Sequence, residues 1–241
     1  YSQAPLTLMR HYKYWKVYRM NPDLKNVASH MFHLGTGALQ HANWHSHYGS
    51  YENPFWPELS VLQAAHSAEI LIKARIAEEH PLLIFDQIPK STQINDDLLD
   101  FEHLLSKAKT IQYSELPERL WAATGIKIKN LDTFKKFGNL RNNVQHFAAP
   151  KGIDCSLETV KFIFEVIDPF INECWNLFAI DFNEDSEPYE YLFSYLVRNK
   201  VLFIVSPQCL EDFENIDCWG DNSAYNNEMK RRFVEAKEKY L

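Results

Sequence analysis

The stretch 58–79 constrains the fold most, because apolar residues cover nearly every side of the helix that it predicts. Most helices of soluble proteins bury one apolar stripe and expose a polar face. Here the apolar positions are Leu59, Val61, Leu62, Ala64, Ala65, Ala68, Ile70, Leu71, Ile72, Ala74, Ile76 and Ala77. A helix of this composition has to lie at the centre of the molecule, with other elements packed around it.

Further long helices are expected on both sides of this segment, and together they predict an all-α protein. Apolar residues recur at helical spacing over 22–47 and 131–147, and a third helix is expected over 156–182 with a kink at Pro169. Only 7 glycines in 241 residues leave few tight turns, which argues against a hairpin-rich β fold. Shorter helices are expected at 97–107 and 117–124, and a polar connector at 89–95.

A change in composition near 183–188 is the best candidate for a boundary. We therefore divide the chain into a helical bundle at 1–182, with its core at about 23–182, and a C-terminal extension at 183–241. The pattern is weaker in the extension. There, helices are expected at 189–199 and 228–240 and a strand at 201–205.

Composition and charge exclude several classes of protein. The chain has 25 Lys and Arg against 32 Asp and Glu, a formal charge of -7, which argues against a nonspecific nucleic-acid-binding protein with a positive surface. The most apolar stretch, 191–205, is interrupted by Arg-Asn-Lys at 198–200, so no membrane span is expected. No CxxC pair is present, and we expect reduced thiols in a cytoplasmic protein. The cysteines are Cys155, Cys174, Cys209 and Cys218.

Arg141 occupies an unusual place in the helix expected at 131–147. The apolar stripe of this helix consists of Phe137, Leu140, Val144 and Phe147. At about 100° of rotation per residue, Arg141 lies beside this stripe, whereas Asn142 and His146 lie one turn apart on the polar face. A guanidinium beside an apolar stripe keeps its charge and needs an anion, which can be a carboxylate or a phosphate.

The central apolar helix carries such a carboxylate. His66, Glu69 and Lys73 form a narrow polar stripe on it, and Glu69 and Lys73 have the spacing of an intrahelical ion pair. Arg141 and Lys73 supply cations that can stabilise the charge of a pentavalent phosphorus, and His146 supplies an imidazole that can move a proton near neutral pH. The two helices together therefore hold the side chains needed to act on a phosphodiester.

The sequence R-N-N-V-Q-H at 141–146 resembles the R-N-x-x-x-H motif of the HEPN-domain family. Upstream, E-I-L-I-K at 69–73 resembles the E-x-x-x-K that the family carries on the preceding long helix. The resemblance covers about residues 23–182. The family consists of up-and-down bundles of four or five helices and includes many metal-independent ribonucleases. The resemblance therefore implies an HEPN-like bundle and an endoribonuclease of the toxin or antiphage-effector type that acts on RNA.

The resemblance also implies a role for each residue of the motif. Arg141 would orient the scissile phosphate and offset its charge, and His146 would act as general base or acid while the ribose 2′-hydroxyl attacks the phosphorus. Asn142 would hold the imidazole and the backbone, and Glu69 and Lys73 would support the arginine or position the RNA. No metal or other cofactor is implied, because the nucleophile belongs to the substrate.

The family commonly places two such motifs face to face, which implies a homodimer with a composite active site. Arg141 and His146 lie about 140° apart on an ideal helix, so a second copy can bring the two groups to one phosphate. In toxins that a nucleotidyltransferase neutralises, the motif continues as H-x-Y. Here Phe147 and Ala148 follow the histidine, so an antitoxin or other regulatory partner would have to act in another way.

Other interpretations stay open for the same residues. Arg141 and His146 can be surface residues of an amphipathic helix, and Glu69 and Lys73 can form a simple intrahelical ion pair. His66 can be a packed or hydrogen-bonded histidine. The chain as a whole can be an inactive HEPN-like module that binds RNA or a nucleotide, or that scaffolds a defence complex, and it can also be a helical adaptor.

Three further patterns have a structural interpretation beside a functional one. His41 and His45 have a spacing that zinc sites use, but no carboxylate or thiol accompanies them, and we expect a histidine face that is either solvated or stacked on aromatic residues. Gly35 and Gly37 fall inside a helical pattern, which indicates close helix packing rather than a phosphate-binding loop. A lysine cluster before the Arg141 helix suits either an RNA backbone or a solvated face. Its members are Lys127, Lys129, Lys135 and Lys136.

Overall fold

The computed structural model describes residues 20–89, 101–183, 188–213 and 223–241. Helices account for 73% of the structure and strands for 3%, which confirms the prediction of an all-α protein. The α-helices are α1 (Val27–His47), α2 (Trp56–Glu79), α3 (Phe101–Lys107), α4 (Leu116–Thr124), α5 (Leu131–His146), α6 (Cys155–Phe162), α7 (Asp168–Trp175), α8 (Pro188–Arg198), α9 (Pro207–Phe213) and α10 (Ala224–Tyr240). The other elements are 3-10 turns at Pro22–Leu24, Pro81–Ile84, Tyr113–Glu115 and Ala179–Asp181, a π-helical turn at Ile163–Ile167, and the strands β1 (Phe85–Gln87) and β2 (Lys109–Thr110).

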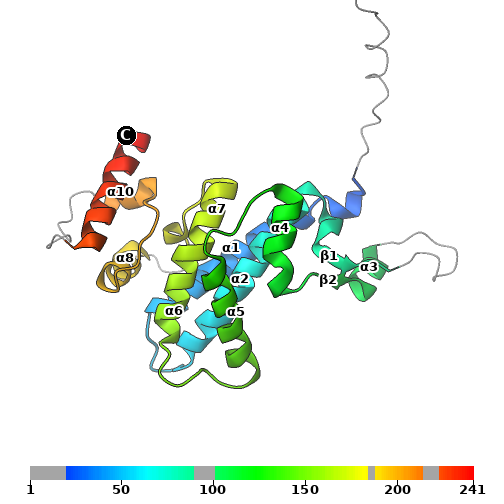
Figure 1. The fold of residues 1–241 in the computed structure, drawn as a ribbon, viewed down its shortest axis with the longest axis horizontal. Helices are drawn as coiled ribbons and strands as arrows, with labels where there is room; N and C mark the ends of the chain where they lie inside the picture. Colours follow the sequence, from blue (N-terminus) through cyan, green and yellow to red (C-terminus); the bar gives the residue numbers. More distant parts are fainter. Residues whose placement is uncertain (1–19, 90–100, 184–187, 214–222) are drawn as a thin grey trace, which may run out of the picture.

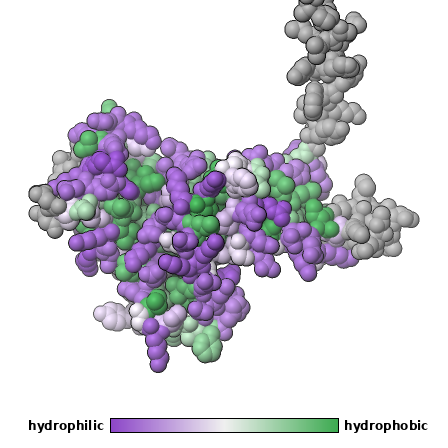
Figure 2. Space-filling model, in the orientation of Figure 1, coloured by the Kyte–Doolittle hydropathy of each residue, from purple (hydrophilic) through white to green (hydrophobic). Residues whose placement is uncertain are grey.

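Helix α2 runs through the middle of the molecule, as its composition predicts (Figure 1). Helix α1 lies along it, and α4, α5 and α6 contact its other sides. The strand pair and α3 lie at one end of the long axis, and α8 and α10 lie at the other end (Figure 1). Hydrophilic side chains cover most of the face shown in Figure 2, and apolar side chains are exposed there in smaller areas.

Gly35 sets the close approach of α1 and α2. A Cβ atom at Gly35 would lie 2.7 Å from Cγ of the buried Leu71, and the hydroxyl of Ser67 donates a hydrogen bond of 2.9 Å to the Gly35 carbonyl. The predicted close packing is therefore confirmed at Gly35. It is wrong at Gly37, where nothing lies within 4 Å of a Cβ atom.

The helix expected over 156–182 contains a π-helical turn ahead of Pro169, and it ends at Trp175. Pro169 has no N–H to donate to the carbonyl of Glu165 four residues earlier. Nδ2 of Asn130 donates a hydrogen bond of 2.8 Å to that carbonyl. The backbone accommodates the proline through the π-helical turn at Ile163–Ile167, between α6 and α7.

The segment between α2 and α4 contains an antiparallel strand pair that the sequence did not predict. In this pair Phe85 lies opposite Thr110, and the N–H of Ile111 donates a hydrogen bond of 2.9 Å to the carbonyl of Ile84. The expected connector at 89–95 lies mostly outside the described residues. The helix expected at 97–107 is described only from residue 101, where α3 begins.

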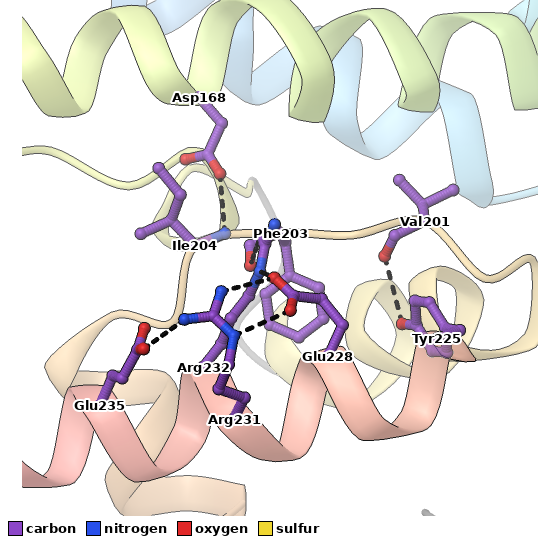
Figure 3. A network of polar contacts seen from close by, with 9 residues as sticks. All are labelled: Asp168, Val201, Phe203, Ile204, Tyr225, Glu228, Arg231, Arg232 and Glu235. Carbon is purple, nitrogen blue, oxygen red and sulfur yellow. Dashed lines mark hydrogen bonds and ion pairs between the residues drawn. The ribbon is translucent and has the colours of Figure 1, made fainter. Parts of the chain in front are cut away.

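The described residues contain no strand at 201–205, where the sequence predicted one. Side chains satisfy the backbone of this segment instead (Figure 3). The carboxylate of the fully buried Asp168 accepts hydrogen bonds from the N–H of Ile204 at 3.0 Å and of Ala179 at 2.8 Å. Burial raises the pKa of Asp168 to about 7, and the two backbone hydrogen bonds oppose part of this increase.

The other side of the 201–205 segment is bonded to α10 (Figure 3). Nη1 of Arg232 donates a hydrogen bond of 2.7 Å to the Phe203 carbonyl, and the Tyr225 hydroxyl donates one of 3.1 Å to the Val201 carbonyl. One apolar core runs from the bundle into α8, α9 and α10. The segment therefore attaches the C-terminal helix to the bundle by hydrogen bonds on both of its sides.

Three of the cysteines are reduced thiols outside any disulfide bond: Cys155, Cys174 and Cys209. Cys218 lies outside the described residues, as does most of the boundary expected at 183–188. None of the described helices has the length and apolar character of a membrane span.

Candidate functional site

Arg141 on α5 pairs with Glu69 on α2. Its Nη2 atom lies 3.8 Å from Oε2 of Glu69, and its Nη1 atom donates a hydrogen bond of 3.0 Å to Oδ1 of Asn142. The apolar stripe beside it is buried at Phe137 and Leu140. The prediction that a guanidinium in this position pairs with an anion is therefore confirmed, and a carboxylate of the central helix is that anion.

Glu69 also binds Lys73, one turn further along α2. Nζ of Lys73 lies 2.7 Å from Oε1 of Glu69 and donates a longer hydrogen bond of 3.4 Å to Oγ1 of Thr110. Only 8% of the Lys73 side chain is exposed, so this pair differs from the solvated ion pairs that contribute little to stability. Two cations share one carboxylate, which leaves the Arg141, Lys73 and Glu69 cluster with a net charge of one positive unit.

A cavity of about 670 Å³ opens beside this cluster. One wall comes from α5 and the opposite wall from the segment that follows β2. The residues that line it are Glu69, Thr110, Ile111, Gln112, Tyr113, Ser114, Phe134, Lys135, Gly138, Asn139, Arg141 and Asn142. The volume falls within the range of about 300–1,000 Å³ that is usual for small-molecule sites.

Tyr113 forms part of the cavity wall, and the sequence did not identify it as a site residue. Its ring stacks on Phe134 with centroids 4.3 Å apart, and a Cβ atom at Gly138 would lie 2.6 Å from it. Burial raises the pKa of the Tyr113 hydroxyl, and the nearby Arg141 opposes part of this increase. Gly138 is the one sequence signal for this contact, because a glycine inside a helical pattern indicates a close neighbour.

His146 lies apart from the cluster. It is the last residue of α5, its side chain is exposed, and it is absent from the lining of the cavity. Phe147 was predicted to extend the apolar stripe, but this is wrong: its φ of -147° and ψ of -82° leave the helix, and 95% of it is exposed. His66, on the stripe of Glu69, is also exposed and outside the cavity.

Three lysines of the predicted cluster line three different cavities. Lys135 lines the Arg141 cavity. Lys129 lines a cavity of about 560 Å³ next to α10, and Lys136 lines one of about 390 Å³ between α5 and α6. Lys135 is therefore the member of this cluster that lies beside the arginine.

His41 and His45 of α1 lie against aromatic rings, which is one of the two arrangements that the sequence left open. Nδ1 of His45 lies 2.7 Å from Oε1 of Gln63, and the His45 ring centroid lies 4.6 Å from that of Trp56. The His41 ring centroid lies 5.9 Å from that of His45. Within the described ranges, no group of three or more His, Cys, Asp or Glu residues is arranged to hold a metal ion.

No protein-family model matches the chain, and comparisons with curated proteins and with solved structures give no match either. The function therefore has to be inferred from the motif and the geometry around Arg141.

Proposed function

We propose that the protein is a metal-independent endoribonuclease with an HEPN-like bundle. The observation that carries the proposal is the position of Arg141 at the edge of a cavity of about 670 Å³, opposite the Glu69–Lys73 pair. The R-N-x-x-x-H and E-x-x-x-K patterns imply the same juxtaposition. The positive cluster stands out in a chain whose formal charge is -7, and it offers a local site for an RNA phosphate.

In this proposal the phosphate binds at Arg141, which offsets the charge that develops on its nonbridging oxygens. The ribose 2′-hydroxyl attacks the adjacent phosphorus while His146 removes its proton, and the bond to the 5′-oxygen of the next nucleotide breaks. That oxygen takes up a proton as it leaves. The products are a 2′,3′-cyclic phosphate and a 5′-hydroxyl, and Asn142 helps to orient the motif.

The active form that we propose is a homodimer. His146 is exposed at the end of α5, whereas Arg141 faces α2 and the cavity. A second copy that brings its own His146 to this cavity would complete the site, since the two groups point about 140° apart on one ideal helix. The exposed Phe147 next to His146 is available to such a contact.

RNA cleavage in the cytoplasm arrests growth, so we propose the role of a toxin or an antiphage effector, restrained by an antitoxin or another regulatory partner. Expression of the wild-type chain should stop growth of the host. Expression of a His146→Ala variant at the same level should not, and equal toxicity of the two would contradict this role.

Incubation with total RNA in EDTA tests the chemistry directly. We expect wild-type protein to leave 2′,3′-cyclic phosphate and 5′-hydroxyl ends, and we expect His146→Ala to cleave about 10²–10⁴-fold more slowly. His33→Ala is the matched control, because His33 is an exposed histidine of α1 that bonds only the Ser29 carbonyl of its own helix. A requirement for divalent metal, or equal rates for wild type and His146→Ala, would reject the proposal.

The second candidate is an inactive HEPN-like module that binds RNA or a nucleotide, or that scaffolds a defence complex. It is favoured by the ion pair that already neutralises Arg141 through Glu69 and by the distance of His146 from the cavity lining. RNA binding that depends on Arg141, with no cleavage by the dimeric protein, would select this candidate.

A further inference from the structure

The cavity beside Arg141 is lined by charged side chains and by neutral polar ones. The charged side chains are those of Glu69, Lys135 and Arg141. The neutral polar residues carry hydroxyl and amide groups, among them those of Ser114 and Asn139. A ligand that combines an anionic group with neutral hydrogen-bonding groups therefore suits this cavity.

We propose that the neutral polar residues of this lining form a nucleobase subsite that reads the nucleotide on the 5′ side of the cut, with Ser114 and Asn139 as its specificity-determining residues. The inference rests on the proposed function in placing the phosphate of that nucleotide at Arg141. A nucleotide combines the two kinds of group, since its phosphate is anionic and the edge of its base carries neutral hydrogen-bond donors and acceptors.

Ser114 and Asn139 are free to make these bonds. Both side chains are exposed to the cavity, and among the described residues neither forms a hydrogen bond within the chain. A serine hydroxyl and an asparagine amide each donate and accept, so together they can match the edge of one base and leave another with unpaired groups. Such a mismatch is what produces discrimination between bases.

The wall that carries Ser114 is held in place. Its neighbour Tyr113 stacks on Phe134 with an interplanar angle of 4° and fits against Gly138, which has no Cβ atom to displace it. The opposite wall is helix α5, which carries Asn139 and Arg141 two residues apart. A rigid pocket discriminates between ligands better than a mobile one, because little ordering is needed on binding.

Calorimetric titration with the four nucleoside 3′-monophosphates tests the subsite on the full chain. For wild-type protein we expect the best and the worst base to differ about tenfold in affinity. In the double variant Ser114→Ala/Asn139→Ala this spread should fall below about twofold. Arg141→Ala should instead weaken all four ligands by a similar factor, because it contacts the shared phosphate.

Asn143→Ala is the matched control, since Asn143 is an exposed asparagine of α5 that is absent from the lining of the Arg141 cavity. It should retain the wild-type spread. The subsite would be overturned if none of the four ligands bound. It would also be overturned if the affinities of wild-type protein for the four bases differed less than about twofold, or if the double variant kept the wild-type difference in affinity.

Cleavage of total RNA in EDTA, with the ends sequenced, separates this inference from the proposed function. If the affinity differs between the four bases but no RNA is cleaved, the subsite is supported and the nuclease proposal is rejected. Cleavage that depends on His146 but shows no base preference would retain the nuclease and reject the subsite. Preference at the 5′ position that the double variant loses would support both.

Discussion

Glu69 lies between a half-buried cation and a buried one: its Oε2 atom is 3.8 Å from Nη2 of Arg141, and its Oε1 atom is 2.7 Å from Nζ of Lys73. The longer contact is the one that borders the cavity, and Lys73 of the shorter one is buried. In the function that we propose, a phosphate that binds Arg141 would compete with the longer of the two contacts. Lys73 would keep its carboxylate during that exchange.

Substitutions within this pair should have unequal effects on stability. Glu69→Gln leaves the ammonium group of Lys73 buried without a carboxylate, and we expect the free energy of unfolding to fall by about 2–4 kcal/mol. Lys73→Met removes the buried charge at similar volume and leaves Glu69 paired with Arg141, so we expect a loss below about 1.5 kcal/mol. Urea denaturation measures both, and an equal or smaller loss for Glu69→Gln would contradict this account.

Two adjacent arginines of α10 provide a second comparison. Arg232 donates a hydrogen bond of 2.7 Å to the Phe203 carbonyl, outside its own helix, whereas the partners of Arg231 among the described residues are Glu228 and Glu235 of α10. We expect Arg232→Ala to cost about 1.5–3 kcal/mol of stability and Arg231→Ala to cost much less. Hydrogen exchange should show faster opening of α10 only in the first variant. Similar exchange in the two would mean that this bond does not hold the helix.

The buried carboxyl of Asp168 should make stability depend on pH. Burial raises its pKa from 3.8 to about 7, so the folded protein holds this proton more tightly than the unfolded chain does. The stability that this group contributes is therefore fully present below pH 3.8 and is lost as the pH rises to about 7.

Between these two pH values we expect the free energy of unfolding to fall by at most about 1.4 kcal/mol per pH unit. Urea denaturation from about pH 4 to about pH 8 should show this slope as the difference between wild type and Asp168→Asn, which has no proton to lose. If the two proteins had parallel pH profiles, Asp168 would not be the group responsible.

The two glycines of α1 should respond to alanine in opposite directions. At Gly35 the new methyl group would lie 2.7 Å from Cγ of the buried Leu71, and we expect a loss of about 1–3 kcal/mol from overpacking. At Gly37 the space is open, and the better helix propensity of alanine should add about 0.5–1 kcal/mol. Thermal unfolding of both variants would settle the comparison, and a stabilised Gly35→Ala would show that α1 and α2 can separate without cost.

The sequence predicts the central helices well because apolar periodicity is local information. It places α2 and α5 within two residues of their observed ends, and it predicts that Arg141 faces an anion of the central helix. These features depend on the angle at which each side chain leaves its own helix. That angle follows directly from the order of the residues.

The features that the sequence does not predict depend on contacts with residues far away in the chain. The segment 201–205 has the composition of a strand, but its hydrogen bonds are made by the side chains of Asp168, Tyr225 and Arg232 instead of a neighbouring strand. Gly138 indicates a close neighbour without saying that it is Tyr113. Similarly, the spacing from Arg141 to His146 gives an angle but not the second copy that we propose to complete the site.

The contact between Asp168 and the N–H of Ile204 also bears on how the molecule can be divided. A fragment that stopped at residue 182 would keep the whole R-N-x-x-x-H motif. It would nevertheless strip a buried carboxylate of one of its two donors and uncover the apolar surface beneath α8 and α10. Helices α8, α9 and α10 thus complete the core of the bundle, and a shortened chain made to test the proposed activity has to include them.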